Sequence, residues 1–398
     1  MRICLLLVPW LVLLGIFLPS AAVHAKPPRR PIDVIISTDL GTDIDDTFAL
    51  AHLLALSKPT TSDAVPLLNV LCIITATSDT LSRLKILGKL LTDSGSTYSN
   101  IPIVQGVSEM PLSEEYLEAG EQAGFPWAAS FDLSTYRGPV VYENEWLSYV
   151  RSLLSSRPSS SPPLIFLELA PPTNSAVLLS SSPALPPFPI LAMSGSVYLG
   201  YDALPPAVPE FNVKGFGGSA VSSSCVLYNS SDPLSPVVWA PPPSSLTPRL
   251  AAAPLDVSGL FRLTGAPYRV LRHAASSGDL LMLSTLSHYA DWVSNVPYNN
   301  VFNETYDVEE GTTTLWDVVA VGLFLQQVGA LGTGGDLFNT KDLIIKIGED
   351  GTTNVVEGSD IRDKSECQGL VREALEWTEG KIDEFAKLYV DTLLRRVE

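Results

Sequence analysis

The chain has 398 residues, of which 46% are hydrophobic and 17% charged. This composition suits a large globular domain and excludes a disordered chain. The 43 acidic and 25 basic residues give a net charge of −18 at pH 7, which argues against a surface that neutralises nucleic-acid phosphates. A small neutral or metal-bound ligand fits this charge better.

The N-terminus has the pattern of a secretory signal peptide. Arg2 precedes an apolar run at residues 3–18, and small residues then lead to a cleavage site after Ala25. A membrane anchor is the alternative, but the run is short and contains Pro9 and Gly15. We therefore expect an exported, secreted protein that has no membrane attachment after cleavage.

The cysteines do not form a disulfide framework. Cys72, Cys225 and Cys367 remain after cleavage, and an odd number allows at most one bridge and one free thiol. Cys72 lies in an apolar run and is predicted to be a small buried hydrophobic residue. Asn229 and Asn303 begin Asn-x-Ser/Thr triplets, which are glycosylation acceptors in a secreted eukaryotic protein.

Short apolar runs alternate with helical patterns after the signal peptide. The runs, rich in Val and Ile, predict strands at 33–37, 67–76, 101–104, 164–169 and 189–193. Helical patterns lie between them at 46–56, 80–91 and 173–179. This alternation predicts an α/β fold with a mainly parallel, Rossmann-like sheet flanked by helices, whose ligands bind beyond the carboxyl ends of the strands.

The C-terminal part is predicted to contain an extended segment at 342–347 and one helix at 368–394. The helix is predicted from apolar residues mostly at helical spacing, namely Leu370, Ala374, Trp377, Phe385, Leu388 and Leu393.

The chain is predicted to divide into a signal peptide at 1–25 and one domain at 26–398. No internal repeat is present. The Pro/Ser-rich stretches at 155–163, 180–189 and 241–248 are too short to separate domains and are interpreted as surface loops.

An aspartate cluster follows the first predicted strand. Asp39, Asp43, Asp45 and Asp46 lie within eight residues, with a glycine turn at Gly41. The start of a helix stabilises one or two nearby carboxylates. Four converging carboxylates repel one another unless protons or a cation intervene, and a hard divalent cation with oxygen ligands is the simplest solution.

Two other motifs do not match this cluster. An EF-hand loop requires Asp-x-Asp-x-Asp-Gly spacing, which is absent. A phosphotransferase of the aspartyl-phosphate kind requires a nucleophilic aspartate at the position that Ser37 occupies.

The segment at 37–46 resembles the signature of the nucleoside hydrolase family, including its inosine–uridine-preferring members. Its sequence is Ser-Thr-Asp-Leu-Gly-Thr-Asp-Ile-Asp-Asp. Three further matches follow in the expected order, at 167–176, at 193–196 with 209–213, and at 315–321. The resemblance extends from Asp33 to about Leu325 and implies the fold of this family and hydrolysis of N-ribosidic bonds.

The resemblance also implies roles for individual residues. Calcium would be held by Asp39, Asp46, Asp317 and the carbonyl of Thr173, and Asp39 would also act as general base. The ribose hydroxyls would be bound by Asp45, Glu210, Asn212 and Asp317, with Met193 beneath the ring. Asp43 lies outside the common pattern, so its role is open. Family members are commonly dimers or tetramers, so the resemblance also implies a homodimer or homotetramer.

One departure from the family concerns the leaving base. Trp316 occupies the position of the histidine that protonates the base in many members, and an indole has no usable proton. Trp316 either stacks on a purine base, which would allow protonation by solvent, or is a core aromatic residue at the start of a helix.

The remaining histidines are not assigned to the chemistry, and the replacement at Trp316 leaves alternative functions open. His52 is interpreted as structural, and His288 is a weaker candidate for a pocket residue. The leading hypothesis is a secreted calcium-dependent nucleoside hydrolase that leans towards purine nucleosides. The alternatives are a non-catalytic exported protein that binds sugars or nucleosides, and a hydrolase of another glycoside.

Overall fold

The computed structural model describes residues 30–59, 65–108, 122–158, 161, 164–183, 185, 188–201, 203–231, 248–296, 307–331, 335–356 and 367–394. The predicted signal peptide, the Asn303 motif and most of the stretch at 241–248 lie outside these residues. Within them, no helix has the length and apolar character needed to cross a membrane.

One sheet of ten strands forms the centre of the protein, in the order β4-β3-β2-β1-β5-β6-β7-β10-β8-β9. The strands are β1 (Ile32–Thr38), β2 (Leu68–Thr75), β3 (Ile103–Gln105), β4 (Val140–Val141), β5 (Leu164–Glu168), β6 (Ile190–Met193), β7 (Leu250–Ala253), β8 (Phe338–Ile347), β9 (Thr353–Val355) and β10 (Gln368–Trp377). Every neighbouring pair from β4 to β10 is parallel, and β8 is antiparallel to β10 and β9. The predicted mainly parallel sheet is confirmed.

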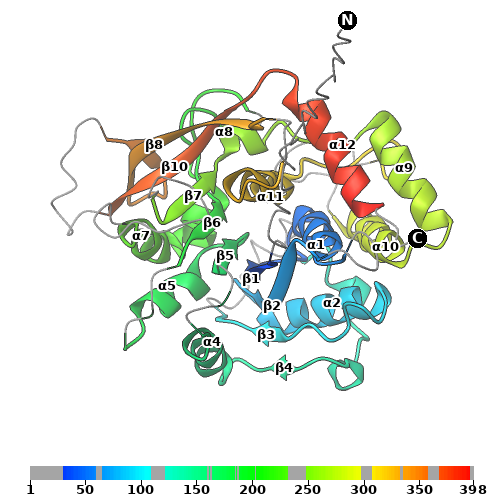
Figure 1. The fold of residues 1–398 in the computed structure, drawn as a ribbon. Helices are drawn as coiled ribbons and strands as arrows, with labels where there is room; N and C mark the ends of the chain where they lie inside the picture. Colours follow the sequence, from blue (N-terminus) through cyan, green and yellow to red (C-terminus); the bar gives the residue numbers. More distant parts are fainter. Residues whose placement is uncertain are drawn as a thin grey trace, which may run out of the picture.

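Helices cover both faces of this sheet (Figure 1). They are α1 (Asp45–Leu56), α2 (Thr80–Asp93), α4 (Trp146–Ser155), α5 (Thr173–Ser180), α6 (Phe211–Lys214), α7 (Val221–Asn229), α8 (Leu255–Ser258), α9 (Gly265–Ser276), α10 (Leu280–Asn295), α11 (Trp316–Gln327) and α12 (Lys381–Leu393). Two buried apolar clusters separate the layers: α1, α2 and α8 to α12 contribute to one, and α4, α5 and α7 to the other. Along β1, Ile36 faces the first cluster and Ile35 the second, which explains why the strand is apolar without alternation.

The strand order reverses between β1 and β5. After β1 the chain builds β2, β3 and β4 on one side, and it then returns to place β5, β6 and β7 on the other. The connections after β1 and β5 therefore diverge from the carboxyl ends of these strands. Open α/β sheets bind their ligands at such a switch point.

The single helix predicted at 368–394 is wrong. Residues Gln368–Trp377 form β10, and only Lys381–Leu393 form helix α12. Gly380, with φ of 74°, separates the two elements. The spacing of the apolar residues was misleading because β10 lies between β7 and β8, where side chains on both faces are buried. The extended segment predicted at 342–347 is confirmed as part of β8.

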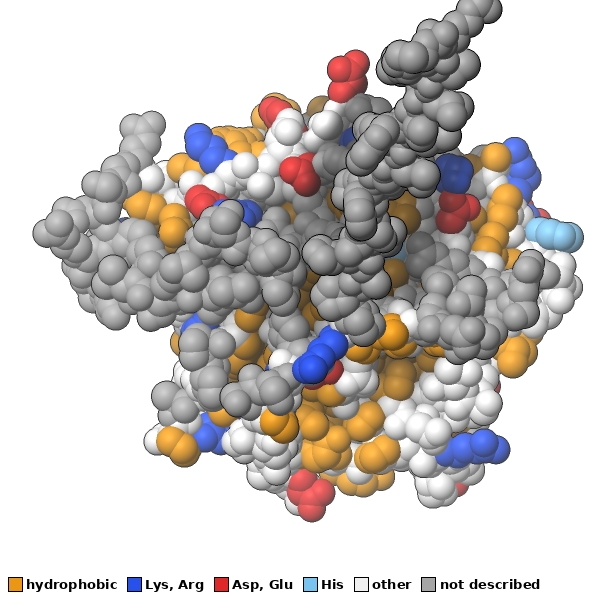
Figure 2. Space-filling model, in the orientation of Figure 1, with side chains coloured by type: hydrophobic (Ala, Val, Ile, Leu, Met, Phe, Trp, Pro, Cys, Tyr) orange, Lys and Arg blue, Asp and Glu red, His pale blue; other side chains and the backbone are white. Residues whose placement is uncertain are grey.

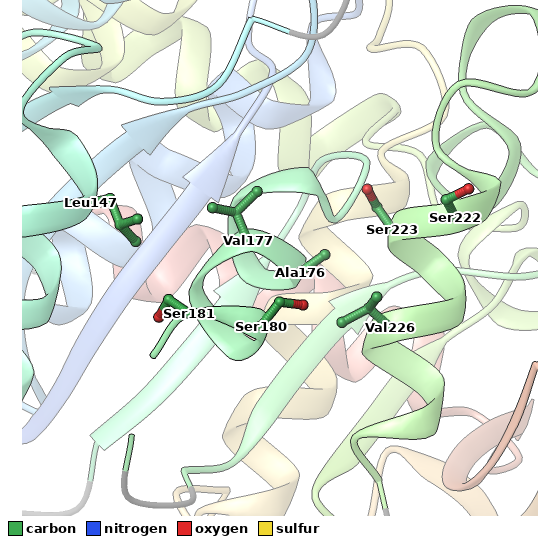
Figure 3. A pocket seen from close by; sticks show the side chains of 8 residues that line it. All are labelled: Leu147, Ala176, Val177, Ser180, Ser181, Ser222, Ser223 and Val226. Carbon is green, nitrogen blue, oxygen red and sulfur yellow. The ribbon is translucent and has the colours of Figure 1, made fainter. Parts of the chain in front are cut away.

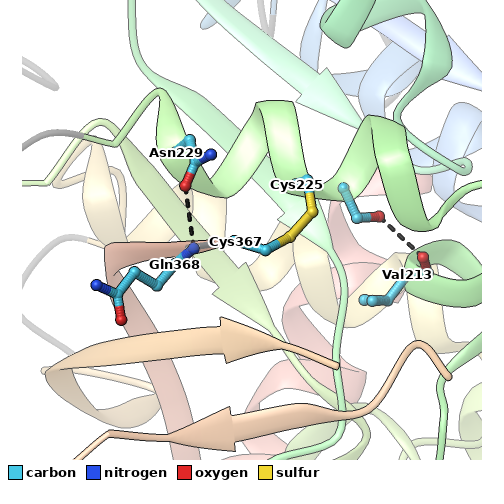
Figure 4. The surroundings of a disulfide bond; sticks show 6 residues. Val213, Cys225, Asn229, Cys367 and Gln368 are labelled. Carbon is cyan, nitrogen blue, oxygen red and sulfur yellow. Dashed lines mark hydrogen bonds between the residues drawn. A yellow bond between two sulfur atoms is a disulfide. The ribbon is translucent and has the colours of Figure 1, made fainter. Parts of the chain in front are cut away.

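The cysteines form one disulfide and leave one free thiol. Cys225 of α7 is bonded to Cys367, directly before β10, across 142 residues of sequence (Figure 4). The adjacent Asn229 side chain accepts a hydrogen bond from the backbone N–H of Gln368 at 3.0 Å. Cys72 is free and buried in β2, as predicted.

Helix α12 provides a test of the C-terminal packing. Phe385 is fully buried, with its ring centroid 4.9 Å from that of Phe261 and 5.7 Å from that of Trp377. We expect Phe385→Ala to lower the free energy of unfolding by about 3–5 kcal/mol because it leaves a cavity. The control Leu283→Ala removes a side chain that is 49% exposed. It should change the free energy of unfolding by less than about 1 kcal/mol when both variants are measured by urea titration. Equal effects of the two substitutions would contradict this packing.

Candidate active site

The predicted site residues all lie at the carboxyl edge of the parallel strands. Asp39 directly follows β1, and Thr173 begins α5 after β5. Met193 ends β6, and Glu210 immediately precedes α6, which contains Asn212. The first turns of α1 and α11 supply the others, Asp45, Asp46, Trp316 and Asp317.

Three carboxylates from two distant segments meet at this edge. One carboxylate oxygen from each of Asp45, Asp46 and Asp317 lies within 4.8 Å of the others, and all three side chains are buried. The backbone N–H of Asp317 donates to Asp45 Oδ2 at 3.1 Å, which joins the starts of α11 and α1 directly. Asp46 accepts a hydrogen bond from Thr38 Oγ1. This group of oxygens suits a hard divalent cation.

Asp39 lies beside this group and is joined to it through Asp46. A side-chain hydrogen bond with Asp46 and the nearby Arg83 charge both lower the pKa of Asp39, but burial outweighs them and raises it overall. Thr77 Oγ1 donates to Asp39 Oδ2 at 3.4 Å. The Asp39 carboxylate is therefore in direct contact with the group formed by Asp45, Asp46 and Asp317, and its role as general base stays a prediction.

Burial raises the pKa values of the clustered aspartates well above their usual range. Desolvation is the largest cause for Asp45, Asp46 and Asp317, and repulsion among the carboxylates adds to it. Asp43, whose carboxylate accepts a hydrogen bond from the N–H of Ile44 at 2.6 Å, contributes to this repulsion. A group of acids that cannot all ionise together in isolation is the electrostatic signature expected of a cation site.

Arg83 is a site residue that the sequence interpretation missed. It is fully buried in α2, and its guanidinium donates to the backbone carbonyls of Asp39, Leu40 and Ser78 and to Thr42 Oγ1. These bonds fix the turn after β1, in which Gly41 has φ of 104°. Helical periodicity could have identified it, because Arg83 is the one charged residue on the buried face of α2, beside Leu84 and Leu87.

Glu210 and Asn212 organise the backbone after β6. Glu210 Oε1 accepts from the N–H of Asn212 at 2.7 Å, while Oε2 accepts from the N–H groups of Gly195 and Val213 at 2.9 and 3.2 Å. The Asn212 side-chain amide donates to the carbonyl of Met193 at 3.0 Å. Their predicted contacts with ribose hydroxyls stay predictions, but both residues shape the loop that would make them.

Trp316 is buried as a core aromatic residue at the start of α11, which is one of the two roles predicted for it, and stacking on a base stays a prediction. Its side chain is only 8% exposed and belongs to the core cluster around α11. Its ring also meets the ring of Tyr201 edge-on, with centroids 6.2 Å apart. Tyr201 Oη accepts from the backbone N–H of Phe211 at 2.9 Å, so this aromatic pair is connected to the start of α6.

Neither candidate histidine joins the carboxylate group. His52 lies in the core between α1 and α12, with its ring 4.8 Å from that of Tyr389, as its structural interpretation predicted. His288 Nδ1 lies 2.9 Å from Thr47 Oγ1, and the ring stacks on Trp127. Burial lowers the pKa of His288 to about 3, so the imidazole is neutral and packs behind the first turn of α1.

Glu168 is a second residue near the site, after Arg83, that the sequence interpretation missed. It ends β5 opposite Ser37 of β1 and is 1% exposed. Burial raises its pKa to about 8, and the hydroxyls of Ser175 and Ser37 offset this only in part. The Glu168 carboxyl is therefore mainly protonated at neutral pH, in contrast to an exposed glutamate.

A separate groove lies between α5 and α7 (Figure 3). Its volume is about 450 Å³, and its lining residues are Leu147, Ala176, Val177, Ser180, Ser181, Ser222, Ser223 and Val226. None of them carries a charge or belongs to the predicted site. The groove therefore supplies no acid, base or metal ligand to the carboxylate group.

Comparison with solved structures places this arrangement in a known fold. An inosine-guanosine nucleoside hydrolase matches with a TM-score of 0.60 at 15% identity, covering 91% of this chain and 98% of that one. A purine-preferring ribonucleoside hydrolase from Gardnerella vaginalis matches with a TM-score of 0.57 at 14% identity and the same coverage. The chain has the nucleoside hydrolase fold.

A protein that is described as an effector rather than as a hydrolase has a similar fold. The type III effector protein XopQ, solved in complex with adenosine diphosphate ribose, matches with a TM-score of 0.56 at 13% identity, covering 92% of this chain and 94% of that one. No protein-family model matches this chain, and no curated protein matches it by sequence. The nucleoside hydrolase fold predicted from four short motifs is therefore established by the structure.

Metal binding can be tested through stability. We expect a divalent cation to raise the Tm of the wild-type protein because it relieves the repulsion at Asp45, Asp46 and Asp317. Asp46→Asn should remove most of this increase, yet should melt no lower than the wild type in EDTA, because one source of repulsion is gone. The exposed control Asp391→Asn should respond to the metal as the wild type does. Equal increases in Asp46→Asn and the wild type would contradict the proposed ligand.

Glu168 predicts a specific pH dependence of stability. Because its pKa rises from 4.5 to about 8 on folding, the folded state is penalised increasingly as pH rises through that interval. The free energy of unfolding of Glu168→Gln, relative to that of the wild type, should therefore increase by on the order of 1 kcal/mol or more between pH 5 and pH 8. Urea titrations in EDTA at both pH values measure this difference. The exposed control Glu379→Gln should show no such gain, and a pH-independent effect of Glu168→Gln would refute the assignment.

Proposed function

We propose that this protein hydrolyses the N-glycosidic bond of ribonucleosides, releasing the free base and ribose, and that it requires calcium. The observation that carries the proposal is the meeting of Asp45, Asp46 and Asp317, with Asp39 beside them, at the switch point of a nucleoside hydrolase fold. Buried carboxylates in this number suit a reaction that develops positive charge on a sugar ring.

Calcium is the proposed ion because the available donors are oxygen atoms. Asp39, Asp46, Asp317 and the carbonyl of Thr173 would hold it, and the position of Asp45 adds a further carboxylate to this set. A calcium ion bound there would acidify water and bind sugar hydroxyls. Its double positive charge would also compensate the repulsion that raises the pKa values of these aspartates.

The protein's own residues would then divide the chemistry between them. Asp39 would accept a proton from the attacking water, whose oxygen forms the new bond to the anomeric carbon as the bond to the base breaks. Asp45, Glu210, Asn212 and Asp317 would orient the ribose hydroxyls above Met193. The bonding electrons leave with the base, which takes its proton from solvent.

Trp316 supports a preference for purine bases. It offers no proton for the leaving base, but its indole and the ring of Tyr201 form an edge-on aromatic pair, and Tyr201 accepts a hydrogen bond from the first residue of α6. A purine presents a larger stacking surface than a pyrimidine and would gain more from contact with aromatic rings. Inosine, guanosine and adenosine are therefore the substrates proposed to turn over fastest.

The proposal also includes the location of the protein, its glycosylation and its assembly. A signal peptide at 1–25 would direct the chain to secretion, and glycosylation at Asn229 fits its exposed position at the end of α7. On the face drawn in Figure 2, basic side chains are scattered singly, which supports a small-molecule substrate rather than a nucleic acid. A homodimer or homotetramer is the proposed assembly.

A second candidate function is binding without turnover. The absence of a proton donor at Trp316 favours it, and the fold is shared with XopQ, which was solved with adenosine diphosphate ribose. Such a protein would bind ribose or a nucleoside with calcium but release no base after long incubation. Hydrolysis of another glycoside by the same carboxylates is the third candidate, and nitrophenyl glycosides test it.

The assignment of Asp39 predicts the activity of one variant. With inosine, guanosine, adenosine and uridine as substrates, the wild-type protein should release reducing sugar and stop when EGTA removes calcium. Asp39→Asn should lower kcat by about a hundredfold or more because the general base is lost. The control Asp391→Asn should retain wild-type kcat. Unchanged turnover in Asp39→Asn would show that another group accepts the proton.

A further inference from the structure

The turn between β8 and β9 reaches the site from the far edge of the sheet. Strand β9 is the outermost strand beside β8, a position that normally exposes one edge. Its first residue, Thr353, is nevertheless only 4% exposed. It is buried against residues 194–198, which follow Met193 at the end of β6 and are called the sugar loop below.

Thr353 makes two hydrogen bonds to one residue of the sugar loop. Its hydroxyl donates to the carbonyl of Ser196 at 2.6 Å and accepts from the N–H of Ser196 at 2.9 Å. Both residues are buried, so no water replaces these partners without cost. The Ser196 hydroxyl in turn donates to the carbonyl of Leu199 and accepts from the N–H of Val208.

A neighbouring residue in the sugar loop connects this contact to the predicted sugar-binding residues. Gly195 has φ of 93°, and its N–H donates to Glu210 Oε2 at 2.9 Å. Glu210 also accepts from the N–H groups of Asn212 and Val213. A displacement of Ser196 is therefore transmitted through Gly195 to Glu210 and to the start of α6.

The same turn also contacts the end of α6. Gly351 has φ of 86°, and a Cβ at this position would lie 2.6 Å from the Cβ of Lys214. The turn thus packs against both ends of the segment that runs from Met193 to Lys214. A side chain larger than hydrogen at Gly351 would separate them.

Helix α7 anchors this arrangement to the C-terminal strands. Ser224 Oγ donates to the carbonyl of Val213 at 2.9 Å, and the adjacent Cys225 is bonded to Cys367 before β10 (Figure 4). Because β10 pairs with β8 along its length, the disulfide and the turn belong to one continuous unit.

We propose that Thr353 is a positioning residue for sugar binding, because its paired hydrogen bonds to Ser196 hold the sugar loop, and through it Glu210 and Asn212, in place. Only the expected kinetic effect of Thr353 rests on the proposed nucleoside hydrolase function. The order of the loop itself does not depend on any substrate.

Three variants separate the hydroxyl from the packing. Thr353→Val keeps the shape but leaves the N–H and carbonyl of Ser196 unpaired, whereas Thr353→Ser keeps the hydroxyl. Thr392→Val is the matched control, since Thr392 of α12 is equally buried and its hydroxyl has no hydrogen-bond partner among the described residues. Circular dichroism and the Tm of each variant establish that it folds.

The first measurement is hydrogen exchange of peptides that contain residues 195–198. Exchange should be about tenfold faster in Thr353→Val, because a buried hydrogen bond worth about 1.4 kcal/mol corresponds to a factor of ten. Thr353→Ser and Thr392→Val should exchange as the wild type does. Wild-type exchange in Thr353→Val, or equally fast exchange in Thr353→Ser, would overturn the positioning role.

The second measurement is the split between KM and kcat with inosine. Thr353→Val should raise KM about tenfold and change kcat less than threefold, because the loop binds sugar in both the ground state and the transition state. A loss confined to kcat would overturn the proposal. If the wild-type protein turns over no nucleoside, the proposed function fails, and the exchange measurement still decides whether Thr353 holds the loop.

Discussion

Electrostatic repulsion among buried carboxylates is the constraint on which this structure depends. The starts of two helices bring Asp45, Asp46 and Asp317 together; Asp45 and Asp317 are 272 residues apart in sequence, and the backbone N–H of Asp317 donates to the Asp45 carboxylate. Burial makes their simultaneous ionisation unfavourable, and the buried Arg83 contributes only one positive charge beside them. Such a site could hold a divalent cation, which would stabilise every carboxylate at once.

The sheet topology explains why these groups meet. Strands β1 and β5 are neighbours, but the connections that leave them run to opposite sides, so their carboxyl ends form the switch point at which open α/β sheets bind ligands. Helix α1 begins there after β1, and α11 packs beside it with its own first turn at the same level. The loop at residues 194–198 follows β6 at the same edge, and its hydrogen bonds with Thr353 connect it to the antiparallel edge of the sheet.

The elements that were predicted correctly are those that local sequence patterns determine, and the errors concern features that depend on contacts between distant residues. Strands β1, β2, β5 and β6 were predicted within a few residues because apolar side chains on both faces leave a continuous run. Strand β10 was mistaken for a helix, since its apolar residues serve two faces and only its neighbours β7 and β8 decide its backbone pairing. The disulfide between Cys225 and Cys367 was left open for the same reason.

The sequence by itself determined the class of fold, the segments that bear the acidic residues and their resemblance to nucleoside hydrolases, because these depend on local patterns and short motifs. Only the tertiary structure decided which carboxylates meet, how Arg83 fixes the turn after β1, and that Thr353 supports the loop after β6. These contacts join residues from about 40 to more than 270 positions apart, a separation at which spacing in the chain carries no geometric information.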